Sequence, residues 1–206
     1  MKSGDQAAPK RADVFVRGRF DLLTISFHWI TLGMVALVAA TGYATRFVDD
    51  NSTLGELLTV HRSLGACVWT VAALRLLWRQ TFAHLPPFPL HMPKVQQWTA
   101  KASEYAMYVL LLAQPATGLA DTLFRGHPFA LFESTIPALF PRLPAVFKLA
   151  HTAHEYGAVA LLGLIGLHAT AALFHHFVLR DDVLQAMLPW RIRARIRRQL
   201  GATTTR

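Results

Sequence analysis

The sequence predicts an all-α integral membrane protein, a bundle of four transmembrane helices with both termini in the cytoplasm. Hydrophobic residues make up 53% of the 206 residues and charged residues only 16%, whereas about a quarter is usual in soluble domains. The hydrophobic residues gather in four blocks, each long enough for the roughly 20 residues that cross a bilayer. Lys and Arg, which give a net charge of +9, lie mainly beside these blocks.

The four blocks cover residues 22–44, 57–78, 102–123 and 147–179. We expect each to be a helix, because backbone groups in lipid must be hydrogen-bonded within the segment. The last block is longer than one span and should tilt or protrude from the membrane. The predicted membrane domain is therefore 19–189. A polar basic arm, 1–18, precedes it, and a basic cytoplasmic tail, 190–206, follows it.

The distribution of Lys and Arg predicts the direction of the helices. These residues are abundant in the N-terminal arm, in the segment 79–101 and in the C-terminal tail, and they are sparser in the segments 46–56 and 125–148. The positive-inside rule places the basic segments and both termini in the cytoplasm. Because the basic residues lie beside apolar blocks, we expect lipid contact and no nucleic-acid partner. The single cysteine, Cys67, excludes an internal disulfide and a cysteine-based metal cluster.

Histidine spacing in the last block indicates a binding function. His154 and His168 are 14 residues apart, which is almost four helical turns, so both rings leave the same face about 21 Å apart. His151 points about a quarter-turn away from that face. His175 shares the face but lies only about 10 Å beyond His168. Ionisable residues within membrane segments are functional candidates.

Depth in the membrane pairs these histidines with two others. The predicted directions put His28 beside His168 near the cytoplasmic side, and His61 beside His154 near the outer side. Two facing imidazoles can fill both axial positions of a haem iron, an arrangement that favours electron transfer over oxygen binding. We therefore expect two haems, with glycines such as Gly42 giving room for the flat macrocycles.

The motifs around these residues resemble a known family. They are ISFHW, VHRSLG, QPATGL followed by FRGHPF, HEYGAVALLGLIGLHATAALFHHF, and RDDVLQAMLP. Over about residues 19 to 189 the chain is similar to the bacterial cytochrome b-561 family, and within it to the superoxide oxidases. The resemblance implies a cytochrome of the bacterial inner membrane with two b-type haems on the same four histidines. It also implies that an electron passes from superoxide outside to ubiquinone.

Three residues are candidates for handling the two substrates. Arg62 lies beside the outer ligand, and Arg125 lies in the outer loop; together with Arg142 and Lys148 they would attract the superoxide anion. Acidic residues on the same side oppose this field. His175, near the basic cytoplasmic rim, could hydrogen-bond a quinone carbonyl or a haem propionate, whereas the neighbouring His176 points about 100° away.

Two alternatives remain open at this stage. One is a cytochrome b subunit of a larger enzyme of the hydrogenase or formate dehydrogenase type, which would need a protein redox partner. The short connecting loops favour a self-contained protein. The other is a membrane transporter that uses histidines, although broken helices and intramembrane acids are not evident.

Overall fold

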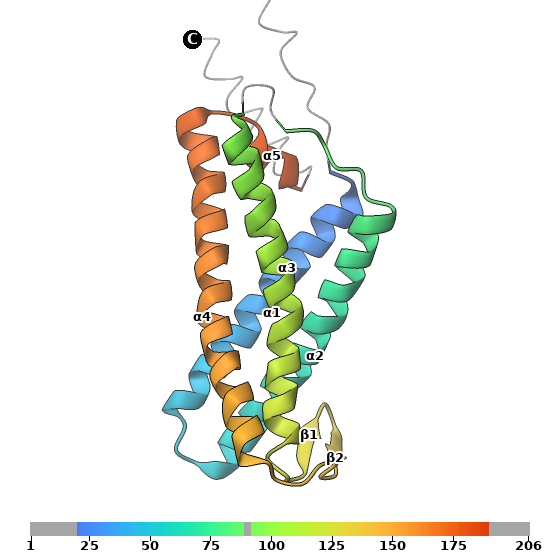
Figure 1. The fold of residues 1–206 in the computed structure, drawn as a ribbon, viewed down its shortest axis with the longest axis vertical. Coiled ribbons are helices and arrows are strands. Elements are labelled where there is room, and N and C mark those ends of the chain that lie inside the picture. Colours follow the sequence, from blue (N-terminus) through green and yellow to red (C-terminus); the bar gives the residue numbers. More distant parts are fainter. Residues whose placement is uncertain (1–19, 89–91, 190–206) are drawn as a thin grey trace, which may run out of the picture.

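The described part of the chain is a bundle of four long helices, each antiparallel to the next along the chain (Figure 1). The structure is a computed structural model that describes residues 20–88 and 92–189. The long helices are α1 (Leu22–Ala44), α2 (Asn51–Thr81), α3 (Lys94–Leu123) and α4 (Pro144–Phe174). The short elements are the 3-10 turn η2 (Thr45–Phe47), the strands β1 (Phe129–Leu131) and β2 (Ser134–Ile136), the π-helical turn η3 (His175–Leu179) and α5 (Val183–Met187).

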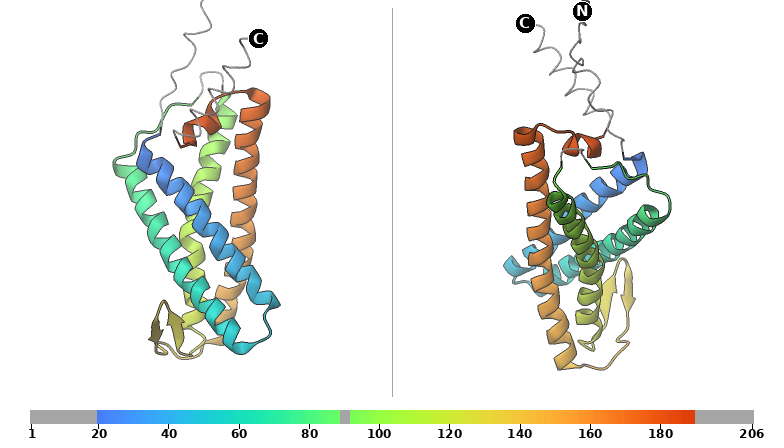
Figure 2. Two further views of the ribbon diagram at one scale, coloured as in Figure 1. Left: turned by 180° about the vertical axis from the view of Figure 1, so that it is seen from behind. Right: turned by 45° about the horizontal axis from the view of Figure 1, so that its top comes forward.

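The bundle has two distinct ends (Figures 1 and 2). The start of α1, the link between α2 and α3, and α5 lie at one end, which we call the terminal end. The turn η2 and the β1–β2 hairpin lie at the other, the hairpin end. The terminal end corresponds to the predicted cytoplasmic side, and this sidedness stays a prediction. The arm 1–18 and the tail 190–206 lie outside the described residues.

Hydropathy separates α3 from the other long helices. Among the described residues, three helical segments are long and apolar enough to cross a membrane: Leu22–Phe47, Asn51–Thr81 and Pro144–Leu179. The helix α3 has 30 residues but is not one of these three segments, and its polar side chains have partners in the bundle. Glu104 accepts from Arg79 at 2.8 Å, and the Gln114 amide donates to the His154 carbonyl at 2.9 Å. The role of α3 as a fourth span stays a prediction.

The helices extend beyond the predicted apolar blocks. The helix α2 begins at Asn51 rather than 57 because the Asp50 carboxylate caps it, accepting from the Thr53 N–H at 2.8 Å. The helix α3 begins at Lys94 rather than 102, directly after Pro93. Such polar first turns are invisible to a hydropathy pattern.

The hairpin corrects the all-α prediction in one detail. Its strands pair antiparallel, with Phe129 opposite Ile136, and each has only three residues. Strands this short have no readable alternation of polar and apolar residues. The hairpin packs on α2, where the Phe132 N–H donates to the Ser63 hydroxyl at 2.7 Å. It therefore covers one side of the hairpin end.

An apolar layer fills the middle of the bundle. Its buried residues come from all four long helices: Val35, Val68, Ala72, Leu111 and Leu161. On α4, Leu161 lies midway between His154 and His168. The apolar layer therefore separates the two levels at which these histidines lie.

Candidate functional site

At the hairpin end, His61 of α2 and His154 of α4 face each other. Their ring centroids are 6.1 Å apart. Two imidazoles that share one metal, each with a metal–nitrogen bond of about 2 Å and a centroid about 1 Å further on, would lie about 6 Å apart. The distance in this pair therefore fits a shared iron.

Hydrogen bonds orient both rings of the hairpin-end pair. The Nδ1 of His61 donates to the Val38 carbonyl on α1 at 3.1 Å, and the Nδ1 of His154 donates to the Gln114 carbonyl on α3 at 2.9 Å. A carbonyl can only accept, so each Nδ1 carries the proton and each Nε2 keeps its lone pair. A ligating histidine almost always has such an acceptor behind it.

Glycines allow these rings to lie close to the neighbouring helices. A Cβ at Gly42 would lie 2.8 Å from the His61 Cε1, and a Cβ at Gly118 would lie 2.9 Å from the His154 Cε1. Both contacts are too short for any side chain. Gly42 was among the glycines expected to make room, but the sequence predicted space for a macrocycle, whereas the structure shows contact with a histidine ring.

The two halves of the hairpin-end site share a sequence pattern that was not among the predicted features of the site. VAATG, 38–42, and QPATG, 114–118, each place the accepting carbonyl at the first position and the glycine at the fifth. The threonine between them, Thr41 or Thr117, donates to that same carbonyl at 2.9 Å and lies 3.2 or 3.3 Å from the histidine Nδ1. The repeated ATG was the available signal. It shows that α1 and α3 place the same three groups, a carbonyl, a threonine and a glycine, beside a histidine ring.

At the terminal end, His28 of α1 and His168 of α4 form a second pair. Their ring centroids are 6.3 Å apart, again about the distance expected for a shared iron. The surroundings differ from those of the first pair. Arg75 of α2 donates to the His28 Nδ1 at 3.3 Å and lies over the Tyr108 ring at 5.3 Å.

This arginine contact bears on how the terminal-end pair would bind iron. An Nδ1 that accepts from Arg75 leaves the proton on Nε2. Iron binding through Nε2 needs the other tautomer, so the guanidinium must then give up this bond. Its positive charge would stay beside the pair, because the guanidinium also rests on the Tyr108 ring. Both histidine pairs therefore fit a haem iron, and the terminal-end pair needs one rearrangement to bind it.

The other helical histidines have different partners. His151, which the spacing set apart from the ligands, lies 3.2 Å from the Asp121 carboxylate and is about half exposed. His175 is largely buried, and its Nδ1 donates to the Asp181 carboxylate at 2.5 Å. The His176 ring packs edge-to-face against the Phe177 ring.

The contact between His175 and Asp181 depends on the end of α4. There η3 replaces the last α-helical turn, and Arg180 adopts a left-handed conformation with φ 54°. The chain turns back, and Asp181 reaches the imidazole six residues before it. His175 was predicted from the sequence and Asp181 was not, because no regular helix would bring the two together.

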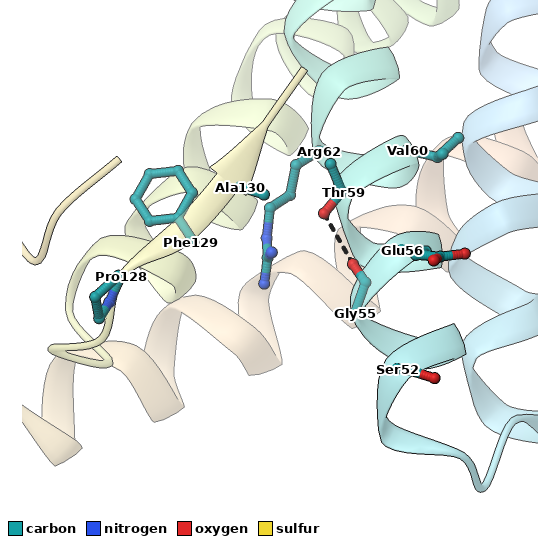
Figure 3. A pocket seen from close by; sticks show the side chains of 9 residues that line it. All are labelled: Ser52, Gly55, Glu56, Thr59, Val60, Arg62, Pro128, Phe129 and Ala130. Carbon is teal, nitrogen blue, oxygen red and sulfur yellow. Dashed lines mark hydrogen bonds between the residues drawn. The ribbon is translucent and has the colours of Figure 1, made fainter. Parts of the chain in front are cut away.

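Arg62 lines an open pocket of about 620 Å3 at the hairpin end. Figure 3 shows its side chain between β1 and the first turns of α2, and its guanidinium lies 5.8 Å from the Phe129 ring centroid. Glu56 lines the same pocket. The residue next to His61 in sequence is therefore directed toward the hairpin.

Arg125 is less available to an anion than its position in the sequence suggested. It forms an ion pair with Asp121 at 2.8 Å and lies over the Phe147 ring. Asp121 also contacts His151. Arg62 is therefore the cation that lines the hairpin-end pocket. The positive charge of Arg125 is offset by Asp121.

Comparisons with known proteins agree with the motifs. The family model described as prokaryotic cytochrome b561 matches residues 19–190. Cytochrome b561 homolog 1 of Escherichia coli K12 is 29% identical over 177 residues, which cover 84% of this chain and 98% of the relative. A Yersinia pestis protein named probable superoxide oxidase CybB is 28% identical over 174 residues, 83% of this chain and 96% of the relative. Cytochrome b561 homolog 2 of E. coli K12 is 27% identical over 172 residues, 82% and 91% of the two chains.

Proposed function

The chain belongs to the prokaryotic cytochrome b561 family, and from that premise we propose that it passes electrons from superoxide at the hairpin end to ubiquinone at the terminal end. Members of this family are membrane cytochromes that bind b-type haem. The finer proposal is that this chain holds two haems, one between His61 and His154 and one between His28 and His168. It would do so in the bacterial inner membrane, with the hairpin end outside.

The observation that carries the proposal is the presence of two imidazole pairs at opposite ends of one bundle. Each pair has ring centroids about 6 Å apart, and the apolar layer lies between the pairs. A haem b held between two such imidazoles would supply a one-electron couple with little affinity for oxygen. A relative named as a probable superoxide oxidase supports superoxide as the donor.

At the hairpin end, the chain's task would be to attract an anion and position the outer ligands. Arg62 in the open pocket supplies a positive charge beside the ligand-bearing turn of α2. The carbonyls of Val38 and Gln114 hold the two imidazoles in the ligating tautomer. Two superoxide anions would each lose one electron there and leave as dioxygen.

At the terminal end, a quinone would gain these two electrons and two protons to become a quinol. His175 is the candidate proton donor, since Asp181 holds its Nδ1 and leaves Nε2 to exchange a proton. The Trp29 indole donates to the Met187 carbonyl at 2.9 Å, which ties α5 to α1 close to the His28 turn. The His175 ring and the Asp181 carboxylate are therefore held in place before any ligand arrives.

The proposal is tested by mixing purified holoprotein with superoxide and recording haem reduction, followed by reoxidation with a ubiquinone analogue. We expect superoxide to reduce the haems rapidly and the quinone to reoxidise them. A protein that keeps its haems but is not reduced by superoxide would contradict the proposal. That result would favour the role of a cytochrome subunit of a larger enzyme, as would co-purification of a stoichiometric partner.

The role of His175 is tested by comparing His175→Ala with His176→Ala. Both variants should keep their haems and their reduction by superoxide. We expect only His175→Ala to slow reoxidation by quinone, and Asp181→Asn to have a smaller effect in the same direction. Equal reoxidation rates in His175→Ala and the unmodified protein would remove His175 from the quinone site.

A further inference from the structure

The two histidine pairs lie in opposite electrostatic surroundings. At the hairpin end, both imidazoles donate to backbone carbonyls, those of Val38 and Gln114. Such a bond gives the imidazole partial anionic character and makes it a more basic ligand. A more basic ligand stabilises the oxidised, more positively charged iron.

At the terminal end, a cation contacts the pair instead. Arg75 reaches the His28 Nδ1 and rests on Tyr108. Within the described residues it forms no salt bridge, since the nearby Glu104 carboxylate binds Arg79 at 2.8 Å. A positive charge at this place favours the reduced iron, because reduction adds one negative charge to the site.

Three arginines at the hairpin end are placed differently from Arg75, because they form no hydrogen bond to the imidazoles there. Arg62 turns toward Phe129 and the pocket, and Arg125 is paired with Asp121. Arg46, further out, is exposed and paired with Glu155 at 3.3 Å. None of these three hydrogen-bonds to His61 or His154 in the part of the chain that the structure describes.

We propose that these surroundings give the haem at the terminal end a higher reduction potential than the haem at the hairpin end, and that Arg75 sets most of the difference. The inference rests on the proposed function only in that each pair must hold a haem. An electron that enters at the hairpin end would then move to the terminal end spontaneously. The direction of electron flow would be a property of the chain itself.

The expected effect of Arg75 is large enough to measure. At an effective dielectric constant of about 20, a unit charge 6 to 10 Å away shifts a one-electron equilibrium by roughly ten- to a hundredfold. Arg75→Leu should therefore lower the midpoint potential of the terminal-end haem by a shift of that order and leave the other haem nearly unchanged. Arg75→Lys, which keeps the charge, should restore most of the shift.

The experiment is an equilibrium redox titration of the purified holoprotein, followed through the haem absorbance, for these variants and for Arg46→Leu. Arg46→Leu removes an exposed arginine and is expected to leave both midpoints in place. Two haems whose midpoints do not move in Arg75→Leu would overturn the inference. Equal lowering of the terminal-end midpoint in Arg75→Leu and Arg75→Lys would also overturn it, because the effect would then not be one of charge.

The order of the two potentials is tested independently of Arg75. His154→Ala should keep only the terminal-end haem, and His28→Ala only the hairpin-end haem. We expect the haem that remains in His154→Ala to titrate at the higher potential, and the reverse order would contradict the inference. Failure of superoxide to reduce the protein would instead contradict the proposed function. It would not affect the inference about the two midpoint potentials, because the equilibrium titration does not use superoxide.

Discussion

Replacing Gly118 by alanine should disturb the hairpin-end pair and spare the terminal-end pair. The new Cβ would lie 2.9 Å from the His154 Cε1 and 3.1 Å from its Nδ1. Ordinary carbon contacts are about 3.5 to 4.0 Å, so the ring must move by roughly half an ångström or more. That movement strains the 2.9 Å hydrogen bond from Nδ1 to the Gln114 carbonyl.

The size of the effect follows from the cost of overpacking. An extra methyl group in a tightly packed site costs about 1 to 3 kcal/mol. Since about 1.4 kcal/mol is a factor of ten in affinity, the hairpin-end haem should bind roughly 5- to 140-fold more weakly. The haem at the terminal end, on the far side of the apolar layer, should be unaffected.

The assay is the haem content of the purified variant, together with the rate at which haem passes to an acceptor apoprotein. Gly33→Ala is the matched control, because nothing lies within 4 Å of a Cβ at that position. Alanine there should leave haem binding unchanged and favour the helix by about 1 kcal/mol. If Gly118→Ala keeps both haems with the transfer rate of the unmodified protein, the packing argument is wrong.

Three further predictions concern ligation, steering and capping. His154→Ala should lose the hairpin-end haem, whereas His151→Ala should keep both; a haem count showing the reverse pattern would reassign the ligand. Reduction by superoxide should slow as salt rises in stopped-flow measurements, because screening weakens the field of Arg62, and a rate that is constant from low to high salt would exclude steering. Hydrogen bonds, first among them the one from the Ser52 hydroxyl, lower the pKa of Asp50 to about 2 from an ordinary value of 3.8. The cap on α2 should therefore stabilise the fold above about pH 4 and weaken as the pH falls toward 2, and Asp50→Asn should remove this part of the pH dependence of thermal unfolding.

The histidine spacing carried enough information to predict which rings lie together. Helical periodicity fixes the face of His154 and His168, and the predicted antiparallel directions fix the depths of His28 and His61. Both rules hold locally along a helix and need no knowledge of side-chain packing. The structure brings the four rings together in the expected pairs, and their role as ligands stays a prediction.

Contacts between distant segments were beyond these rules. Gly118, Thr117 and the Gln114 carbonyl matter because α3 packs against α4, and periodicity on one helix does not report what the neighbouring helix presents. Asp181 reaches His175 only because a π-helical turn and a left-handed residue reverse the chain. The hairpin was missed because its strands are too short for a pattern.

The central claim, that one chain holds two b-type haems between two histidine pairs, is tested most directly by counting haem. The measurement is the reduced-minus-oxidised spectrum of the purified protein together with its haem-to-protein ratio. We expect a b-type spectrum with two haems per chain. A ratio of one, or a protein without a b-type spectrum, would contradict the claim.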